Sequence, residues 1–371
     1  MARRRVSSSS WPTTRTIRGP RPASTSTAPR RASPFPRSPT ARRGACAPSG
    51  STPRRSFDAA RSRPVSLAGA SPAPTSLPRW HAHLHNRQRY YRLGLATAPR
   101  LPPRARRWLA VRVARLGAGW FPDERAAVGR NLARVVPDRD AGWLEGAVDR
   151  VFENFAVCFA DLLSLNREPE PRLWRRVTGV TEQAPTRAAL ARGRGVVAIT
   201  AHLGNWDLAG RALAALGSRV HLVMAPETDA QVGAILARER GGPIRVVRFR
   251  SPFAAVELMA ALRRGDIVAF QMDRALGGRG DRLVPFFGAP APFPLGPFLV
   301  AAAARAPVVP AFCVLQPDGG YRLHVEPAFD VHRGEEASGL RDAVALLESY
   351  VRLYWAQWFN FFDVWGGVNR A

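Results

Sequence analysis

The sequence of 371 residues contains no lysine, so all 55 of its basic residues are arginines, set against 28 acidic residues. Cysteine is also scarce, because only Cys46, Cys158 and Cys313 occur, far apart from one another. That spacing matches neither a disulfide framework nor a zinc site, and it favours a reducing compartment. No apolar run of about 18 residues is present, which predicts that no helix spans a membrane. The first 30 residues lack the apolar stretch of a secretory signal.

Acidic residues are almost missing from the first third of the chain. Residues 1–122 hold 25 arginines and one acid, Asp58, whereas residues 123–371 hold 30 arginines and 27 acids. The net charge of +27 therefore belongs mostly to the N-terminal third. Such an asymmetry predicts an anionic partner for this third, either a membrane surface or a nucleic acid. No aromatic platform or folded motif accompanies the arginines of residues 1–78, which disfavours nucleic acid.

Two segments precede the part of the chain that looks globular. Residues 1–78 hold too few apolar residues to offset the entropy of ordering, so we expect a disordered Arg/Ser/Pro-rich extension. It is either a solvated extension of the protein or translated upstream sequence. Residues 79–120 hold ten arginines, no acid and several aromatic residues.

The segment at residues 79–120 contains a basic amphipathic helix. On a helical wheel, one face is apolar and consists of Leu109, Val113, Leu116 and Trp120. The opposite face is basic and consists of Arg104, Arg107, Arg112 and Arg115. Such a helix is typical of proteins that bind an anionic membrane surface. The alternative is an ordinary helix that packs its apolar stripe on the core.

From residue 121 onward, helical and strand patterns alternate. We expect strands at residues 196–200, 220–224, 244–249, 266–271, 308–315 and 321–326. Helices are expected at residues 123–136, 143–165, 207–216, 228–240, 252–264, 296–305 and 338–358. The alternation predicts an α/β domain over residues 79–371, with a largely parallel central sheet flanked by helices. Residues 79–120 would be its helical N-terminal membrane-associating segment.

A histidine and a carboxylate lie five positions apart after the first predicted strand. His202 follows the apolar run Val196–Thr200, and Asp207 opens the next predicted helix. A strand-to-helix turn is a place where a rigid scaffold presents side chains to a cleft. A nearby carboxylate can fix the tautomer of a histidine and stabilise its charged form. Gly204, between the two, permits close backbone approach by a ligand. The alternative is a loop histidine that is merely hydrogen bonded.

A second group of candidate residues follows the predicted strand at residues 266–271. Asp273 and Arg274 can bind an anionic group or order a loop. The glycine-rich run at residues 277–280 has no phosphate-loop lysine and opens no clear helix, so it is not a nucleotide motif. Phe286 and Phe287, before Gly288, would line an apolar pocket or pack in the core, and core packing is the commoner role of a single aromatic residue.

Aromatic residues also crowd the C-terminus: Tyr354, Trp355, Trp358, Phe359, Phe361, Phe362 and Trp365. They either cap the core or meet lipid. No Gly-x-Ser-x-Gly elbow and no nucleophilic cysteine in a familiar context is present. Direct attack by a substrate hydroxyl, activated by His202, therefore fits better than covalent catalysis. The resulting oxyanion would need donors, for which backbone N–H groups near Gly204 or Arg274 are candidates.

The segment Thr200–Asp207 resembles the H-x-x-x-x-[DE] block of the glycerolipid and lipid A acyltransferase superfamily. The resemblance is closest to the late acyltransferase family of lipid A biosynthesis, which includes the mycobacterial phosphatidylinositol mannoside acyltransferases. It extends over residues 85–366. The other segments that resemble the family, in order and approximate spacing, are Arg125, Asn131–Leu132, Asp273–Arg274, Pro285–Gly288, Pro294–Pro297, Ala306–Pro310 and Trp358–Trp365.

The resemblance implies an enzyme that moves a fatty acyl chain from acyl-carrier protein or acyl-CoA, as co-substrate, to a hydroxyl of a glycolipid. No metal or cofactor is implied. His202 would be the general base and Asp207 its orienting partner. Substrate-binding roles would fall to Gly204, Asn205, Arg240, Asp273, Arg274, Phe287 and Gly288. The enzyme would lie peripherally on the cytoplasmic face of the inner membrane. Many members begin with an apolar anchor that is absent here, so attachment would rest on residues 80–120.

The acceptor and the class of protein leave alternatives open. A lipid A-type acceptor is our first choice, because the resemblance to that family is broad. A phosphatidylinositol mannoside is the second, because lipid A members usually carry Glu where Asp207 stands. A non-catalytic lipid-binding protein on the same fold is an alternative of another class. A binder of anionic polymers that acts through residues 1–122 is a further one.

Overall fold

The computed structural model describes residues 88–164, 170–179, 183–225, 231, 233–235, 244–249, 253–275 and 280–366. All of them belong to one compact unit, Ala70–Ala371. The predicted extension at residues 1–78, the substrate-binding residue Arg240 and most of the predicted helix at 228–240 lie outside the described residues.

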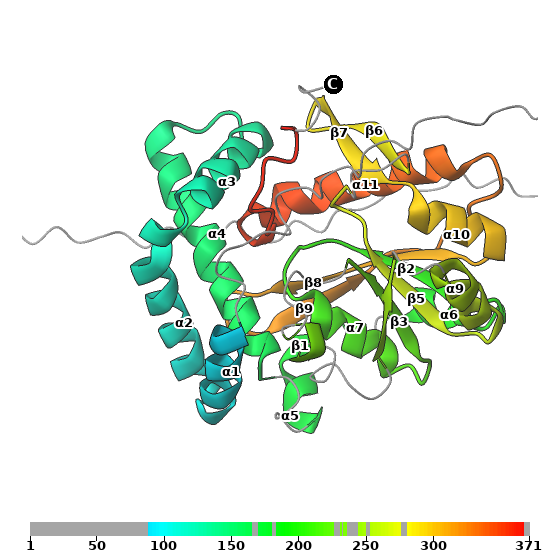
Figure 1. Ribbon diagram of the computed structural model, residues 1–371, viewed down its shortest axis with the longest axis horizontal. Helices are drawn as coiled ribbons and strands as arrows, with labels where there is room; N and C mark the ends of the chain where they lie inside the picture. Colours follow the sequence, from blue (N-terminus) through cyan, green and yellow to red (C-terminus); the bar gives the residue numbers. More distant parts are fainter. Residues whose placement is uncertain are drawn as a thin grey trace, which may run out of the picture. The chain divides into compact units, whose positions relative to one another are not determined.

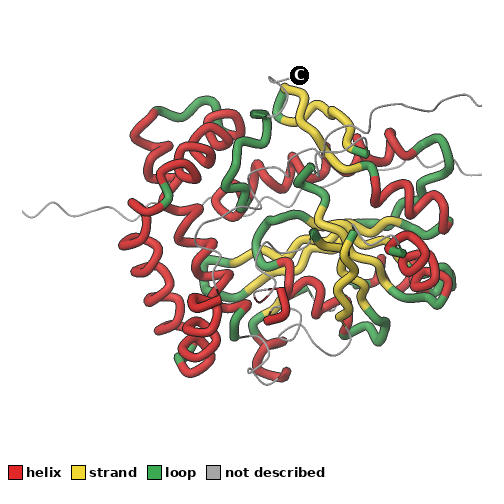
Figure 2. Tube along the Cα trace, in the orientation of Figure 1, coloured by secondary structure: helices red, strands yellow, loops and turns green. Residues whose placement is uncertain are grey.

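A seven-stranded sheet forms the centre of this unit, with helices on both sides of it (Figures 1 and 2). The strand order is β1-β9-β8-β2-β5-β3-β4. In that order the bounds are Val177–Thr178, Tyr321–Val325, Val308–Leu315, Val196–Thr200, Ile267–Gln271, Val220–Met224 and Ile244–Arg248. Neighbouring strands are parallel except for the pair β8 and β9. The predicted α/β fold with a largely parallel sheet is confirmed.

Alternate residues of the central strands pack against helices on opposite faces of the sheet. Val196 and Ala198 share a core with α6 (Ala184–Leu190) and α7 (Trp206–Ala214). Val197 and Ile199 share the other core with α9, α10 and α11. The bounds of these three helices are Ala254–Arg263, Gly296–Ala304 and Glu336–Tyr354. Because both faces of β2 are covered, its first four residues, Val196–Ile199, are buried and apolar.

Helices α1 to α5 precede β1, with bounds Gln88–Thr97, Pro103–Gly117, Pro122–Val135, Ala141–Leu162 and Glu170–Arg175. Short 3-10 helices occupy Ala98–Arg100, Ala118–Trp120 and Trp355–Gln357. Helix α2 packs against α4 through a face on which Ala110 and Gly117 are buried. Its apolar stripe, Leu109, Val113 and Leu116, is exposed, as is Trp120 beyond its end. The alternative that this stripe packs on the core is therefore wrong. Among the described residues, every helix is too short or too polar to cross a membrane.

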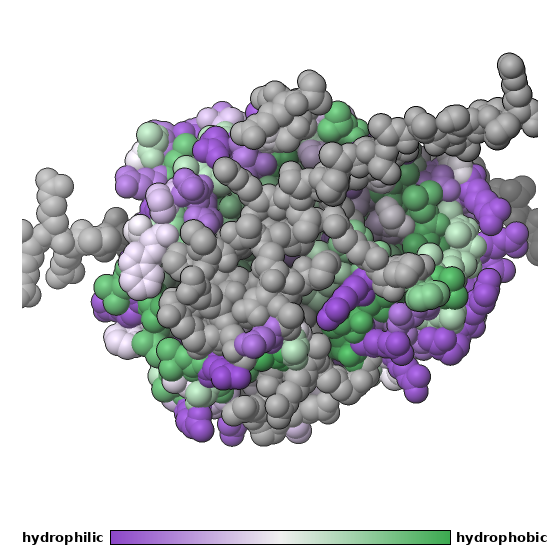
Figure 3. Space-filling model, viewed as in Figure 1, coloured by the Kyte–Doolittle hydropathy of each residue, from purple (hydrophilic) through white to green (hydrophobic). Residues whose placement is uncertain are grey.

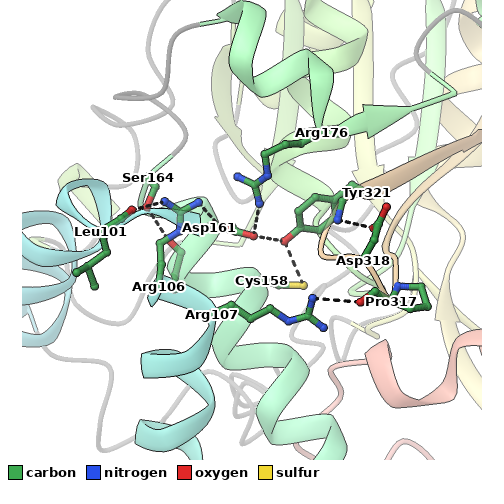
Figure 4. Close-up of polar contacts among 12 residues, drawn as sticks. Leu101, Arg106, Arg107, Cys158, Asp161, Ser164, Arg176, Pro317, Asp318 and Tyr321 are labelled. Carbon is green, nitrogen blue, oxygen red and sulfur yellow. Dashed lines mark hydrogen bonds and ion pairs between the residues drawn. The ribbon is translucent and has the colours of Figure 1, made fainter. Parts of the chain in front are cut away.

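A buried ionic cluster fastens α2 to the sheet (Figure 4). Arg106 of α2 donates from Nε and Nη2 to Asp161 Oδ1 of α4, at 2.8 and 2.6 Å. The other oxygen of Asp161 accepts from Arg176 Nη2 at 3.0 Å and from the hydroxyl of Tyr321 at 2.8 Å. Burial raises the pKa of Tyr321 well above its usual value, so its hydroxyl stays protonated and donates. Removing one member of such a cluster would leave buried charge uncompensated, so α2 is firmly held.

The sequence did not predict a two-stranded hairpin that consists of β6 (Asp281–Phe286) and β7 (Ala289–Pro294). Prolines in both strands argue against strand structure, but this ribbon is separate from the large sheet. Its two-residue turn is Phe287-Gly288, with φ of 50° and 75°. Positive φ at both positions is what a type I′ turn requires. Phe287 packs in the core, and the predicted roles of Phe287 and Gly288 in binding substrate stay predictions.

Candidate functional site

The candidate site lies where β2 and β5 end. The two strands are parallel, and Thr200 pairs with Gln271 at the last register position. His202 and Asp273 each come two positions after one of these paired residues, just beyond the ends of the two strands. The strand pairing therefore brings them together. His202 Nδ1 lies 2.8 Å from Asp273 Oδ1. The backbone N–H of His202 donates to the same oxygen at 3.0 Å.

Asp273 is the most heavily bonded group of the site, and its side chain is fully buried. Its second oxygen accepts from Asn360 Nδ2 at 3.0 Å and from Trp358 Nε1 at 3.3 Å. Burial alone would raise the pKa of Asp273. The charge and hydrogen bonds of His202, with the charge of Arg274, instead lower it to about 2. Asp273 is therefore a carboxylate at neutral pH and accepts all of these bonds.

His202 is held with one ring nitrogen toward Asp273. Because a carboxylate only accepts, Nδ1 carries the proton, and the lone pair of neutral imidazole lies on Nε2. Burial, and next the positive charge of Arg274, lower the pKa of His202, while Asp273 opposes the shift. The ring is thus neutral at pH 7 and can take a proton at Nε2, which is the requirement for a general base. The indole of Trp206 lies beside it, with ring centroids 5.2 Å apart.

The carboxylate on Nδ1 is Asp273, whereas we predicted Asp207. The chain turns after His202, so that Asp207 falls in the first turn of α7, where it is buried. Asp273 reaches the ring because β2 and β5 are adjacent strands, a relation between segments about 70 residues apart. The sequence prediction chose Asp207 because it lies close to His202 in the chain. The observed partner is Asp273 because strand pairing brings it to the ring. The orienting role at Nδ1 is corrected to Asp273.

Gly204 and Asn205 shape the turn between β2 and α7. Gly204 has a φ of 64°, and a Cβ there would lie 2.1 Å from the carbonyl oxygen of Cys313. We expected this glycine to admit a ligand, but the group that approaches it is the backbone of β8. The amide of Gly204 donates to the carbonyl of Gln357 at 3.0 Å, and that of Asn205 to Cys313 at 2.7 Å. The side chain of Asn205 caps α7 by accepting from the amide of Leu208 at 3.0 Å.

Arg274 is bound to the C-terminal segment. Its Nε donates to Asn360 Oδ1 at 3.0 Å, and its Nη2 donates to the carbonyl of Phe359 at 2.8 Å. The guanidinium also lies 5.7 Å from the ring centre of Phe362. Of the two roles that the sequence left open, these contacts match that of ordering a loop. The predicted role of Arg274 in binding substrate stays a prediction.

The C-terminal aromatic residues cap the core rather than standing free of it. Trp358, Phe359 and Trp365 are buried, and the amide of Phe359 donates to the carbonyl of His202 at 2.8 Å. The sequence did not predict the contacts of Trp358 and Asn360 with Asp273. The only signal for them was the resemblance of residues 358–365 to the family.

An apolar pocket lies between the sheet and α7. Most of its lining is aliphatic, including Leu213, Val220 and Ile244. At the carboxyl ends of β2 and β5 its lining includes Thr200 and Gln271, and from the start of α7 it includes Trp206 and Asp207. The lining of the pocket therefore includes Thr200, two positions before His202 in the sequence, and continues along the sheet. Within the described part of the chain, no group of three or more acidic, histidine or cysteine side chains is arranged to hold a metal ion.

The close approach at Gly204 gives a test of the site's framework. Gly204→Ala adds a Cβ that meets backbone atoms, which cannot move as a side chain can. We expect the free energy of unfolding to fall by about 3 kcal/mol or more, since strain at a positive φ alone costs about 1–3 kcal/mol. The control is Gly217→Ala, because Gly217 also has a positive φ but its added Cβ would meet nothing within 4 Å. Urea denaturation measures both, and equal losses would contradict the role given to Gly204.

Comparison with known proteins shows the family of the chain. The chain matches the family described as bacterial lipid A biosynthesis acyltransferase over residues 84–366. Phosphatidylinositol mannoside acyltransferases from two strains of Mycobacterium tuberculosis are each 29% identical to it over 223 residues. The matched region is 56% of this chain and 67% of each relative. With the family match extending over most of the α/β unit that carries His202 and Asp273, the chain belongs to the bacterial lipid A biosynthesis acyltransferase family.

Proposed function

We propose that the protein transfers a fatty acyl chain from an acyl thioester, acyl-CoA or acyl-carrier protein, to a hydroxyl of a glycolipid acceptor, with His202 as the general base. The observation that carries the proposal is the buried pair of His202 and Asp273 at the ends of β2 and β5. It leaves Nε2 of a neutral imidazole as the proton acceptor. Membership of an acyltransferase family supplies the reaction class.

The transfer is a single displacement through a tetrahedral intermediate. The acceptor hydroxyl attacks the thioester carbonyl carbon while its proton passes to Nε2 of His202. The carbon–sulfur bond then breaks, and the proton passes from the imidazolium to the departing sulfur. Asp273 stabilises the imidazolium between these steps. A covalent acyl-enzyme on Cys158 or Cys313, the cysteines that the structure describes, is disfavoured, because burial raises the pKa of both and keeps them as thiols.

Two acceptor classes follow from the family and its members. A lipid A-type glycolipid is the class that the family's description names. The relatives that match this chain act, by name, on a phosphatidylinositol mannoside. Asp207 in place of Glu also favours the mannoside, since the mannoside enzymes resemble the Asp form. We therefore rank the phosphatidylinositol mannoside above the lipid A-type acceptor, which reverses the order that the sequence alone suggested.

Helix α2 supports attachment to a membrane surface. Leu116 is 81% exposed and Trp120 is 68% exposed. Arginines lie beside them, and Arg112 lies over the ring of Trp108 at 5.3 Å. Hydrophobic and hydrophilic surface alternates on the side where α1 and α2 lie (Figure 3). A basic helix with an exposed apolar face is suited to the surface of an anionic bilayer. We propose that the protein binds the cytoplasmic face of the inner membrane in this way.

The central residue is tested by removing its imidazole. His202→Ala should lower acyl transfer by about 10²–10⁴-fold, which is the usual contribution of a general base, and leave folding unchanged. His332→Ala is the matched control, because His332 is exposed and remote from the pair in sequence. Mass spectrometry of lipids formed from palmitoyl-CoA or palmitoyl-acyl-carrier protein, with phosphatidylinositol mannoside and lipid A-type acceptors, is the measurement. Full activity of His202→Ala would refute the base, and lipid binding without transfer by the wild type would favour a lipid-binding protein.

The pH dependence of the same reaction follows from the lowered pKa of His202. The neutral ring is the active form, so kcat/KM should fall with acid only below the ordinary value of 6.5. Asp273→Asn removes the charge that raises this pKa, so the acid limb should move to lower pH while the rate falls. Asp207→Asn should leave the limb in place, since the acceptor on Nδ1 remains. A shift of the limb by Asp207→Asn alone would return the orienting role to Asp207.

The membrane proposal is tested on the exposed face of α2. The double variant Val113→Asp with Leu116→Asp should bind anionic phosphatidylglycerol vesicles at least roughly tenfold more weakly. Each such side chain contributes about 1.5–3 kcal/mol when buried, and about 1.4 kcal/mol is a factor of ten. The matched control is Val256→Asp with Leu353→Asp, which changes side chains that are similarly exposed on α9 and α11. Vesicle co-sedimentation decides, and equal binding by the two double variants would contradict the proposal.

A further inference from the structure

We infer that Thr200 and Gln271 hold the carbonyl group of the acyl thioester beside His202, at the entrance of the apolar pocket under α7. The inference rests on the proposed function and adds two substrate-binding residues to it. Neither residue was among those that the sequence suggested for the site.

The two side chains lie side by side at the ends of neighbouring strands. Thr200 is the last residue of β2 and Gln271 the last of β5, and they are register partners. Both line the pocket between the sheet and α7. Each precedes a member of the His202–Asp273 pair by two positions in the sequence. The pocket lining is otherwise mainly aliphatic, so these two are its polar groups closest in sequence to the pair.

Both side chains carry a buried polar atom that has no partner. Within the part of the chain that the structure describes, Thr200 Oγ1 and Gln271 Nε2 are buried without a hydrogen bond. Leaving a buried donor unsatisfied costs about 1–3 kcal/mol, so buried polar groups are normally paired. Two such atoms on paired residues of one pocket indicate a ligand with an acceptor atom between them. A hydroxyl and a carboxamide N–H both donate, which suits a carbonyl oxygen.

Several other donors around His202 are already committed within the protein. The amide of His202 donates to Asp273 at 3.0 Å. The amides of Gly204 and Asn205, which we considered as oxyanion donors, bond to Gln357 and Cys313. The guanidinium of Arg274, the other group considered, donates to the carbonyl of Phe359 and to Asn360. Thr200 and Gln271 therefore carry donors that the fold itself has not used.

This placement gives the pocket its function in the reaction. The carbonyl oxygen accepts from Thr200 and Gln271, so its carbon faces the acceptor hydroxyl that His202 deprotonates. The carbon next to the carbonyl lies against the aliphatic lining of the pocket. As the hydroxyl oxygen attacks, negative charge grows on the carbonyl oxygen, and preorganised donors stabilise it more than they stabilise the substrate. The oxygen returns to a carbonyl when the carbon–sulfur bond breaks, and the thiol leaves with the proton.

The experiment replaces each donor by an aliphatic side chain of similar shape. Thr200→Val and Gln271→Leu should each lower kcat for palmitoyl-CoA by about 10²–10³-fold, as loss of one oxyanion donor does. The Tm should stay the same or rise, because a buried unpaired polar atom is removed. Thr200→Ser keeps the hydroxyl and is the matched control, with kcat close to that of the wild type. Release of the CoA thiol, with the best acceptor of the lipid panel, gives kcat and KM.

The outcomes separate this inference from the proposed function. If the wild type transfers the acyl chain and both aliphatic variants keep its kcat, the inference is wrong and the carbonyl is bound by other groups, such as amides of the first turn of α7. If kcat falls but Tm falls with it by several degrees, and Thr200→Ser behaves like Thr200→Val, the two residues support structure rather than substrate, which also overturns the inference. If the wild type transfers no acyl chain to any acceptor, it is the proposed function that fails.

Discussion

The site depends on one buried carboxylate. Asp273 has no exposed side-chain surface, and its two oxygens accept from groups on the turn after β2 and on the C-terminal segment. A buried charge is tolerated only when donors surround it, so these segments must stay together for the domain to fold. The same bonds fix the ring of His202 and leave Nε2 as its basic atom. Structural requirement and chemical function thus meet in a single residue.

The C-terminal segment gives this arrangement its rigidity. Phe359 and Asn360 of this segment accept hydrogen bonds from the guanidinium of Arg274. The segment also pairs with the turn after β2 through the backbone of Leu203 and Trp358. Gly204 allows the turn to approach β8 more closely than any side chain would. The turn that carries His202 is therefore held against the C-terminal segment and β8 by groups that do not themselves react. Such support keeps a general base within reach of a substrate proton.

The parts of the fold that depend on local pattern could be predicted from the sequence. Each of the six predicted strands differs from the structure by one residue or less at either end, because continuous apolar runs are what doubly covered strands require. The hairpin of β6 and β7 was missed, since its prolines hide the strand pattern. The apolar stripe of α2 could be predicted from the sequence. Whether that stripe is buried or exposed depends on how the helix packs, which the sequence does not show.

The candidate site could be predicted only in part, for a related reason. His202 is visible in the sequence because it stands at a strand end before a helix. Its partner is not, because the contact with Asp273 arises from the order of strands in the sheet, and sequence alone places Asp207 nearer. Gly204 was assigned to a ligand when its neighbour is the backbone of β8. Thr200 and Gln271 could not be predicted from the sequence, because a buried atom can be recognised as unpaired only when the positions of all its neighbours are known.

Asp273 holds His202 as a neutral base with its lone pair on Nε2. Nitrogen-15 NMR of the His202 ring across a pH titration tests it most directly. We expect a protonated Nδ1 and an unprotonated Nε2 at pH 7, with a pKa of His202 below 6.5. A doubly protonated ring at pH 7, or a neutral ring with its proton on Nε2, would contradict it.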